Sequence, residues 1–547
     1  MTVPAVTRAT GKSLQRLAEQ AWERTAAGSV LYFEGTRWTG LELAERVRRM
    51  SGGLRGAGLA AGERVVVCMA NCPEVGIIYQ AVWRAGAVAT PVLFLLSEAE
   101  LRHVLTDSGA AFVVTTPEFL AKVQAAAAGT EVRAIIVSGA LTPGCGGGLP
   151  LLDFAVLETA PAGALADADP AGLAALLYTG GTTGRSKGVM ISHNALSASS
   201  WAATHSSYDP SLRTGLLPLP LSHVYGLMVS AMALHAPDPG TTVLMRWFDP
   251  VGWLKLAAEH QVQVSPVVPS MLAILLQQPL EDYDLSALRR LSSGGAPLPP
   301  EVGAEFQRRV PGVEVAEGYG CTESAAIIST TPIGQVRPGS VGKPAPGVTL
   351  RIERPDGSEA GPGEDGEVCV RGAMVMTGYW NAEAETGHTL RGGWLHTGDV
   401  GRLDADGYLY IVDRIKDLII RGGYNIYPRD LEDALVTHPD VVAAAVVGRP
   451  DRTYGEEAVA FVQLRPGSAV TEADLVAYGK TRLSAVKYPR EVRIIDQVPL
   501  TSVFKTDRKK LRALLAEDGA AGPAAAGDGA ADEGAAGEGT AKATPAN

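Results

Sequence analysis

An α/β fold followed by a smaller α+β domain is predicted for this 547-residue chain by the order of its apolar patterns. Helical periodicity marks residues 14–26 and 41–57. Short apolar runs typical of buried strands occur at residues 64–69, 111–115 and 132–137. This alternation continues to about residue 395 and is the pattern of helices packed against a mostly parallel sheet.

Three later segments differ from that pattern. Residues 339–413 contain short alternating strands separated by Gly and Pro, which predicts a small antiparallel sheet or barrel. Residues 416–514 mix helical and strand patterns and are expected to form an α+β domain, leaving residues 1–415 as the N-terminal domain. Residues 517–547 consist largely of Ala and Gly without aromatic or branched aliphatic side chains. Such a segment cannot offset its ordering entropy by burial and is predicted to be disordered.

Composition excludes several classes of protein. The formal net charge is −11, which disfavours nucleic-acid binding through a broad basic face. The longest apolar runs fall short of the roughly 18–20 residues that a membrane span requires, and the first residues lack the apolar core of a secretory signal. Five cysteines without metal-site spacing predict neither a disulfide framework nor a zinc site. We therefore expect a soluble, cytoplasmic protein, monomeric or homodimeric.

A glycine-rich segment at residues 178–188 follows an apolar run. Its sequence is Tyr-Thr-Gly-Gly-Thr-Thr-Gly-Arg-Ser-Lys-Gly. Glycines let backbone N–H groups approach an anion, and hydroxyls and a lysine add donors, so a phosphate cradle is indicated, with a surface loop as the alternative. The segment also fits the G-x-S-x-G elbow of hydrolases, with Ser186 as nucleophile. However, an apolar run follows where the elbow requires a helix.

Seven further motifs follow in chain order. They are PLPLSHVYG at residues 218–226, SGGAPL at 293–298, EGYGCTES at 317–324, GWLHTGD at 393–399, DRIKD at 413–417, IRGGYNIYP at 420–428 and PLTSVFKTDR at 499–508. Read singly, they suggest no more than a structural histidine, a β-turn or a surface lysine. Together with the glycine-rich segment, they resemble the motifs of the adenylate-forming superfamily, which includes acyl-CoA synthetases, carrier-loading adenylation domains and firefly luciferase.

The resemblance assigns roles to individual residues. The ATP or AMP site would comprise Thr179, Gly181, Thr182, Thr183, Lys187, Gly295, Ala296, Pro297, Gly318, Tyr319, Gly320, Thr322, Asp399 and Arg414. The acyl pocket would comprise His223, Tyr225, Met228, Gly294 and Ser324. The thiol tunnel would comprise Gly422 and Gly423, and the hinge Lys416. The catalytic residues would be Lys505, Thr182 and Glu323, with Glu323 also the Mg²⁺ ligand.

Side-chain chemistry agrees with these roles. A hard cation prefers oxygen ligands such as the Glu323 carboxylate. The carboxylate of Asp399 can accept bonds from both ribose hydroxyls, and the planar fork of Arg414 suits ribose and phosphate.

The resemblance further implies an N-terminal domain of two α/β subdomains plus a small β-barrel, with a mobile α+β C-terminal domain. It implies an ATP-dependent acyl-CoA synthetase that activates a small-molecule carboxylic acid as an acyl-adenylate and transfers it to coenzyme A. Three alternatives remain open: transfer to carrier-protein pantetheine, thioesterification of a preformed acyl-adenylate, and non-catalytic nucleotide binding on the same fold.

Two residues depart from the common motifs. Gly180 replaces a usual serine in the phosphate loop, and Phe504 replaces a usual glycine before Lys505. Both changes touch the half-reaction with ATP, so the sequence leaves the efficiency of adenylation open. It also leaves the identity of the acid open.

Overall fold

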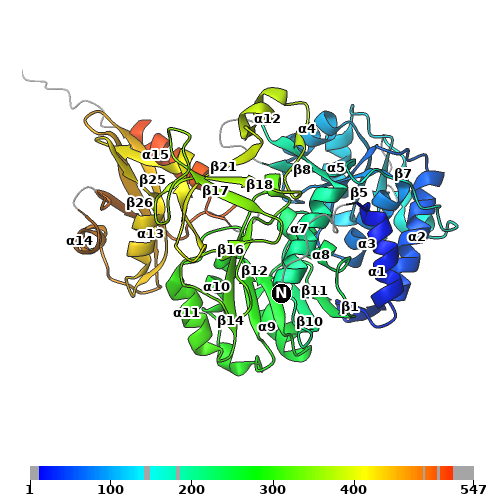
Figure 1. The fold of residues 1–547 in the computed structure, drawn as a ribbon, viewed down its shortest axis with the longest axis horizontal. Helices are drawn as coiled ribbons and strands as arrows, with labels where there is room; N and C mark the ends of the chain where they lie inside the picture. The colour runs from blue at the N-terminus through cyan, green and yellow to red at the C-terminus, as the bar shows by residue number, and fades with distance from the viewer. Residues whose placement is uncertain (1–10, 141–147, 180–184, 485–486, 502–504, 521–547) are drawn as a thin grey trace, which may run out of the picture.

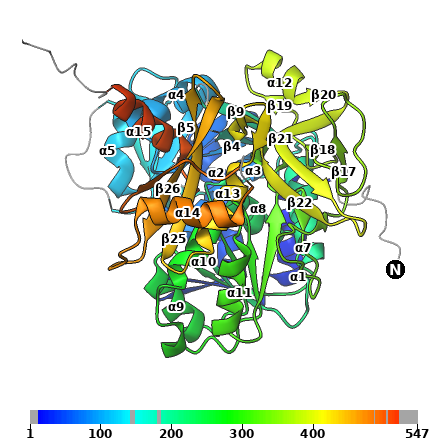
Figure 2. The same ribbon diagram turned by 90° about the vertical axis from the view of Figure 1, so that its left-hand side faces the viewer.

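The computed structural model describes residues 11–140, 148–179, 185–484, 487–501 and 505–520. Two large sheets with their helices form the bulk of the N-terminal domain, a smaller sheet adjoins them, and the C-terminal domain lies at one side (Figures 1 and 2). The α/β class predicted from the sequence is confirmed. Among the helices of these described segments, none is both long and apolar enough to cross a membrane.

The first sheet has eight strands in the order β19-β9-β8-β4-β3-β5-β6-β7. Its strands are β3 (Arg64–Cys68), β4 (Val88–Pro91), β5 (Ala110–Thr115), β6 (Ala134–Val137), β7 (Leu151–Asp153), β8 (Leu173–Thr179), β9 (Lys187–Ser192) and β19 (Gly378–Tyr379). The accompanying helices are α1 (Leu14–Thr25), α2 (Gly40–Gly56), α3 (Pro73–Ala85), α4 (Glu98–Ser108), α5 (Pro117–Ala127), α6 (Phe154–Leu157) and α7 (His193–Ser206). The helices and strands expected between residues 14 and 137 are all present, because their apolar positions face a shared core.

The second sheet has nine strands in the order β16-β15-β14-β13-β12-β10-β11-β1-β2. Its strands are β1 (Val30–Phe33), β2 (Thr36–Thr39), β10 (Thr214–Leu217), β11 (Thr241–Leu244), β12 (Val264–Val267), β13 (Arg290–Ser293), β14 (Glu314–Tyr319), β15 (Ser329–Thr330) and β16 (Lys343–Pro344). Its helices are α8 (Val224–Met232), α9 (Pro250–Glu259), α10 (Pro269–Leu275) and α11 (Pro300–Arg309). The two sheets and their helices are the two predicted α/β subdomains.

A buried asparagine joins the two subdomains. Asn71, 4% exposed, follows β3 of the first sheet. Its Nδ2 donates to the carbonyl oxygens of Leu219 (2.8 Å) and Met245 (2.9 Å), and its Oδ1 accepts from the Leu221 N–H at 2.8 Å. These three partners belong to segments that follow β10 and β11. One side chain therefore forms hydrogen bonds with buried backbone groups of two loops of the other subdomain.

The third sheet has five antiparallel strands. They are β17 (Thr349–Glu353), β18 (Gly366–Arg371), β20 (Leu390–Arg391), β21 (Trp394–Leu403) and β22 (Leu409–Arg414), with α12 (Glu383–Thr389) beside them. The order is β17-β18-β21, and β20 and β22 both pair with β21. The small barrel expected here is not confirmed. The alternating pattern specifies strands, whereas closure would require pairing between the outer strands, and these pairings give a sheet.

The C-terminal domain begins after β22. It contains β23 (Ile419–Arg421), β24 (Tyr424–Ile426), α13 (Pro428–Val436), β25 (Val441–Asp451), β26 (Gly455–Leu464), α14 (Glu472–Arg482), β27 (Glu491–Ile494) and α15 (Arg508–Ala520). The predicted α+β composition is found. Helix α15 is described to residue 520, and residues 521–547 lie outside the described residues, so the predicted disorder of residues 517–547 stays a prediction.

Two hydrogen bonds hold α13 against the end of β22. The Arg429 N–H donates to Asp413 Oδ2 at 3.0 Å, and Arg429 Nη1 donates to the Ile411 carbonyl at 2.6 Å. Arg429 is 9% exposed. These bonds connect the C-terminal domain to the third sheet in the orientation observed in this structure.

We predict that Asn71→Ala lowers the free energy of unfolding of the N-terminal domain by about 2–4 kcal/mol, because it leaves buried backbone donors and acceptors unpaired. Denaturant titration followed by circular dichroism measures this loss. Asn425→Ala, at an exposed position of β24, serves as the control and should stay within about 0.5 kcal/mol of the parent. Equal stability of the two variants would contradict a joining role for Asn71.

Candidate active site

A tight loop after β14 presents two of the predicted site residues. Tyr319 ends β14, and Thr322 and Glu323 lie in the short 3₁₀ helix η3 (Thr322–Ser324). Between them, a Cβ on Gly320 would overlap the Ala326 carbonyl oxygen, so only glycine fits. Ala326 itself has φ of +92°, a conformation that costs a non-glycine residue about 1–3 kcal/mol. The close packing of this loop holds Thr322 and Glu323 in place.

Asp399 lies at the centre of a hydrogen-bond network. The sequence motifs predicted its residues but not the contacts between them. The Asp399 carboxylate is 4% exposed. It accepts from the Tyr319 hydroxyl at 2.6 Å and from Arg414 Nε at 2.8 Å. The Asp399 charge raises the pKa of the Arg414 guanidinium, and burial followed by Asp399 raises the pKa of the Tyr319 hydroxyl. Three predicted nucleotide ligands, far apart in sequence, thus meet at one point.

Glu323 has a partner that the sequence did not reveal. Its Oε1 accepts from the Tyr379 hydroxyl at 2.9 Å. Lys187 Nζ lies 5.6 Å from the centroid of the Tyr379 ring and 3.2 Å from Glu385 Oε1. Tyr379 lies on β19, which pairs with β9 directly after the phosphate loop. The Glu323 carboxylate, oriented by the Tyr379 hydroxyl, is an oxygen ligand of the kind that the hard cation Mg²⁺ prefers.

The glycine-rich segment connects two paired strands. Thr179 ends β8, Lys187 begins β9, and the two residues are register partners. Residues 180–184, which include Gly180, Gly181, Thr182 and Thr183, lie outside the described residues. Because a strand rather than a helix follows Ser186, the segment is not a hydrolase elbow.

Lys505 reaches the site from the C-terminal domain. The Lys505 carbonyl accepts from the Thr501 N–H at 2.7 Å. A Cβ built on Gly295, whose φ is +84°, would lie 3.5 Å from Lys505 Cε. Burial, followed by the Arg414 cation, lowers the pKa of the Lys505 ammonium. Phe504 lies outside the described residues, so its effect on Lys505 stays a prediction.

A cavity of about 600 Å³ opens beside Lys505. Its lining includes four of the five predicted acyl-pocket residues: His223, Tyr225, Met228 and Gly294. Ser324 is not part of the lining, because it is buried inside the η3 loop, where its hydroxyl accepts from the Cys321 N–H at 3.1 Å.

The predicted ATP- or AMP-binding residues of the 293–298 and 317–324 motifs are only partly in contact with this space. Gly295, Gly318, Tyr319, Gly320 and Thr322 line the cavity. Ala296 and Pro297 do not, and Pro297 is exposed on the outer side of the turn.

The cavity continues far beyond the reactive end. It runs along strands β10 and β11 to helices α1, α2 and α3, where Trp22, Leu43 and Gly76 line it. Aliphatic side chains of α8 cover its middle, including Val224, Met228 and Met232. A long, largely apolar space is therefore joined to the polar site at Lys505.

His223 is a neutral group at the start of this space. It is the N-cap of α8, and its Nδ1 accepts from the Tyr225 N–H at 3.3 Å. Burial, with a smaller effect of the nearby Lys505 cation, lowers the pKa of His223 to about 3. His223 therefore both caps a helix and lines the cavity, and its contact with an acyl group stays a prediction.

The predicted thiol-tunnel glycines lie elsewhere in this structure. Gly422 and Gly423 form the two-residue turn between β23 and β24, with φ of +57° and +83°. Neither is part of the cavity lining, and both are exposed. Lys416, the predicted hinge residue, lies in η4 (Ile415–Asp417), between β22 and the C-terminal domain. The observed orientation thus brings Lys505, and not the glycine turn, to the site.

Comparison with protein families gives two matches in chain order. Residues 15–380 match the model of the AMP-binding enzymes, and residues 430–505 match that of the AMP-binding enzyme C-terminal domain. The chain belongs to the AMP-binding enzymes. Within this family it is an adenylate-forming protein close to the acyl-CoA synthetases.

Proteins similar in sequence or structure support this placement in the family. A feruloyl-CoA synthase of Amycolatopsis sp is 36% identical over 493 residues, which is 87% of this chain and 94% of the relative. A long-chain-fatty-acid–CoA ligase of Bacillus subtilis is 34% identical, covering 91% and 94%. The structure of ATP-bound MatB from Rhodopseudomonas palustris superposes with a TM-score of 0.82 at 30% identity, covering 92% and 99%.

We predict that the His223 imidazole of the folded protein does not titrate between pH 5 and 8. Its pKa of about 3 lies below the ordinary value of 6.5, so the unfolded chain binds more protons between these values. The contribution of His223 to stability is therefore present above pH 6.5 and is lost as the pH falls toward 3. NMR of histidine-labelled protein, assigned with His223→Gln, tests this; a midpoint near 6.5 would show an exposed ring.

Proposed function

We propose that this AMP-binding enzyme is an ATP-dependent acyl-CoA synthetase that forms AMP. In the first step a carboxylate oxygen attacks the α-phosphorus of ATP, which gives an acyl-adenylate and pyrophosphate. In the second step the thiolate of coenzyme A attacks the acyl carbon, and AMP leaves. The observation that carries this proposal is the position of Lys505, at the point where the long cavity meets the Asp399 network.

The charges of the site suit the first step. Lys505 supplies a cation beside Gly295 at the cavity mouth, where the substrate carboxylate would meet the α-phosphate. Donors held in place before reaction stabilise the charge that develops in the transition state. Asp399 would accept the ribose hydroxyls, while Arg414, already held by Asp399, would donate to ribose and phosphate.

Mg²⁺ would be held by Glu323, with Tyr379 orienting the carboxylate. When bound, the cation would neutralise phosphate charge.

The second step requires the C-terminal domain to change orientation. Lys505 and the Gly422–Gly423 turn belong to the same domain, and the observed orientation places only Lys505 at the site. The turn has two glycines with positive φ and no side chain that would obstruct a pantetheine arm. We therefore assign adenylation to the observed orientation and thioester formation to a second one. Coenzyme A is the proposed acceptor because the curated relatives are named as CoA ligases and synthetases.

The cavity favours an acid with an extended apolar body. A volume of about 600 Å³ lies within the range of 300–1,000 Å³ typical of pockets for drug-sized ligands. The space continues past His223 and Met228 to Trp22 and Leu43, so a short acid would leave most of it unfilled. Each CH₂ group moved from water into such a space contributes about 0.8 kcal/mol. A chain of many carbon atoms is therefore the proposed substrate class.

Lys505→Ala is predicted to slow adenylate formation by about 10²–10³ while sparing thioester formation from a synthetic acyl-adenylate. The matched control is Lys509→Ala, an exposed lysine of α15. Acid-dependent pyrophosphate release and adenylate-to-thioester conversion are measured separately. Equal losses in both half-reactions would contradict the two-orientation account, and absence of acid-dependent pyrophosphate release in the parent would contradict the proposed activity.

Gly76→Leu is predicted to lower kcat/KM for long-chain acids at least about tenfold and to leave short-chain acids nearly unchanged. Gly76 lines the far end of the cavity, and a Cβ built there meets no atom within 4 Å, so the leucine would fill empty space. Gly56→Leu is the control, since Gly56 is also a helical glycine with no atom within 4 Å but lies outside the lining. Equal losses for all chain lengths would contradict the proposed course of the acyl chain.

A further inference from the structure

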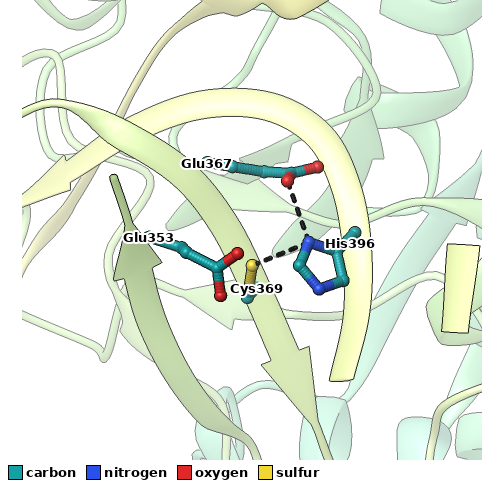
Figure 3. A group of neighbouring side chains, drawn as sticks. All are labelled: Glu353, Glu367, Cys369 and His396. Carbon is teal, nitrogen blue, oxygen red and sulfur yellow. Dashed lines mark hydrogen bonds and ion pairs between the residues drawn. The ribbon is translucent and has the colours of Figure 1, made fainter. Parts of the chain in front are cut away.

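Four potential metal ligands gather on one face of the five-stranded sheet, apart from the active site. Glu353 comes from β17, Glu367 and Cys369 from β18, and His396 from β21 (Figure 3). The opposite face carries the apolar core of this sheet, with Ile352, Val368 and Leu395. Alternation along the strands therefore places all four ligands on the same side.

The strand register brings these side chains together. Glu353 is the register partner of Glu367, and Cys369 is the register partner of His396. One donor atom from each of the four residues lies within 4.8 Å of all the others. His396 Nδ1 is 2.8 Å from Glu367 Oε2 and 3.3 Å from Cys369 Sγ. In a tetrahedral zinc site with bonds of about 2.0–2.3 Å, the ligand atoms are about 3.3–3.8 Å apart, so the spacing of Cys369 and His396 already matches, whereas Glu367 Oε2 would move about 0.5 Å away from His396 on binding.

A catalytic triad does not explain this arrangement. In a Cys–His–Glu triad, the thiol contacts one ring nitrogen and the carboxylate contacts the other. Here both contact the same atom, Nδ1 of His396, as the dashed lines in Figure 3 show. One ring nitrogen cannot accept a proton from Cys369 while it donates one to Glu367. A cation between the three groups would satisfy all of them through its own coordination.

The charges around the cluster also fit a bound cation. Two carboxylates directly opposite each other on neighbouring strands are destabilising unless they are compensated. Arg351 pairs with Glu353, and Arg391 Nη2 donates to Glu367 Oε2 at 3.0 Å. Carboxylates that bind metals are commonly hydrogen-bonded in this way, which fixes their orientation. Cys369 and His396, at 0% and 7% exposed, are shielded from water.

We propose that Glu353, Glu367, Cys369 and His396 bind a divalent transition-metal ion, Zn²⁺ by ligand type. Thiolate, imidazole and carboxylate are all ligands that Zn²⁺ accepts in tetrahedral geometry, and four protein ligands make a closed, structural site. Binding breaks the S–H bond of Cys369, whose proton passes to solvent, and forms the bond from sulfur to the metal. The site does not depend on the proposed synthetase activity.

The metal site would stabilise the strand that carries Asp399. Glu367 Oε1 accepts from the Gly398 N–H at 3.1 Å, and Gly398 directly precedes Asp399. A metal bound through Oε2 leaves this hydrogen bond in place and fixes the carboxylate that makes it. The proposed ion would thus act on the nucleotide site through the position of the β21 backbone.

The test uses full-length protein stripped of metal by a chelator and titrated with Zn²⁺ against a chromogenic chelator, without nucleotide. We expect one equivalent of tightly bound Zn²⁺ per chain, and a rise in Tm on binding. Co²⁺ in its place should give the thiolate-to-cobalt charge-transfer band of a cysteine ligand. Cys369→Ser should abolish this band and weaken Zn²⁺ binding at least about tenfold.

Two further variants keep the test decisive. Glu353→Gln keeps the size of the side chain and should also weaken Zn²⁺ binding at least about tenfold, even if Cys369→Ser fails to fold. Cys68→Ser removes a buried thiol of the first sheet and should leave binding unchanged. The proposal is overturned if the parent binds no stoichiometric Zn²⁺, or if Glu353→Gln binds it as tightly as the parent.

Discussion

The Asp399 carboxylate is the contact on which the arrangement of the site depends. It is almost fully buried and is bound by Tyr319 at the end of the second sheet and by Arg414 at the end of β22. A buried carboxylate without partners would be costly, so these two donors are a requirement of the fold as well as of the site. The same contact joins the loop that carries Glu323 to the strand that leads into the C-terminal domain. One ion pair therefore links the proposed nucleotide site to the proposed hinge.

Much of this organisation was predictable from sequence because it is local. Periodicity identified the helices and strands, and the motif order predicted Asp399, Arg414 and Lys505 as site residues, whose roles stay predictions. Closure of residues 339–413 into a barrel was not predictable, since alternation gives strands but not the pairing of the outer ones. The bond between Tyr379 and Glu323 was also missed, because Tyr379 lies on a strand of two residues, 56 positions away. The hydrogen bond of the Ser324 hydroxyl within the η3 loop was not predictable either, because a small polar residue can equally line a pocket or close a loop.

The long cavity and the polar site meet where the two large subdomains face each other. Helices α1, α2 and α3 accompany the first sheet, whereas β10 and β11 belong to the second. One apolar core runs through both subdomains, and the length of the space between them can vary through single side chains that line its far end, such as Leu43. The polar end has no such freedom, since Gly320 and Gly295 each occupy positions that a side chain would disrupt. Acid selection and adenylate chemistry are therefore under separate structural constraints.

The two hydrogen bonds of Arg429 to Asp413 and Ile411 connect the C-terminal domain to β22 of the N-terminal domain. Each hydrogen bond contributes roughly 0.5–1.5 kcal/mol net. Together they would favour the observed orientation, by about five- to 150-fold, over an orientation in which both hydrogen bonds are broken. A bias of this size is too small to lock the domain and large enough to set its resting position. In the proposed two-orientation mechanism, the chain would rest with Lys505 in place, and departure of a charged product from the site would reverse the preference without any change in the folded core.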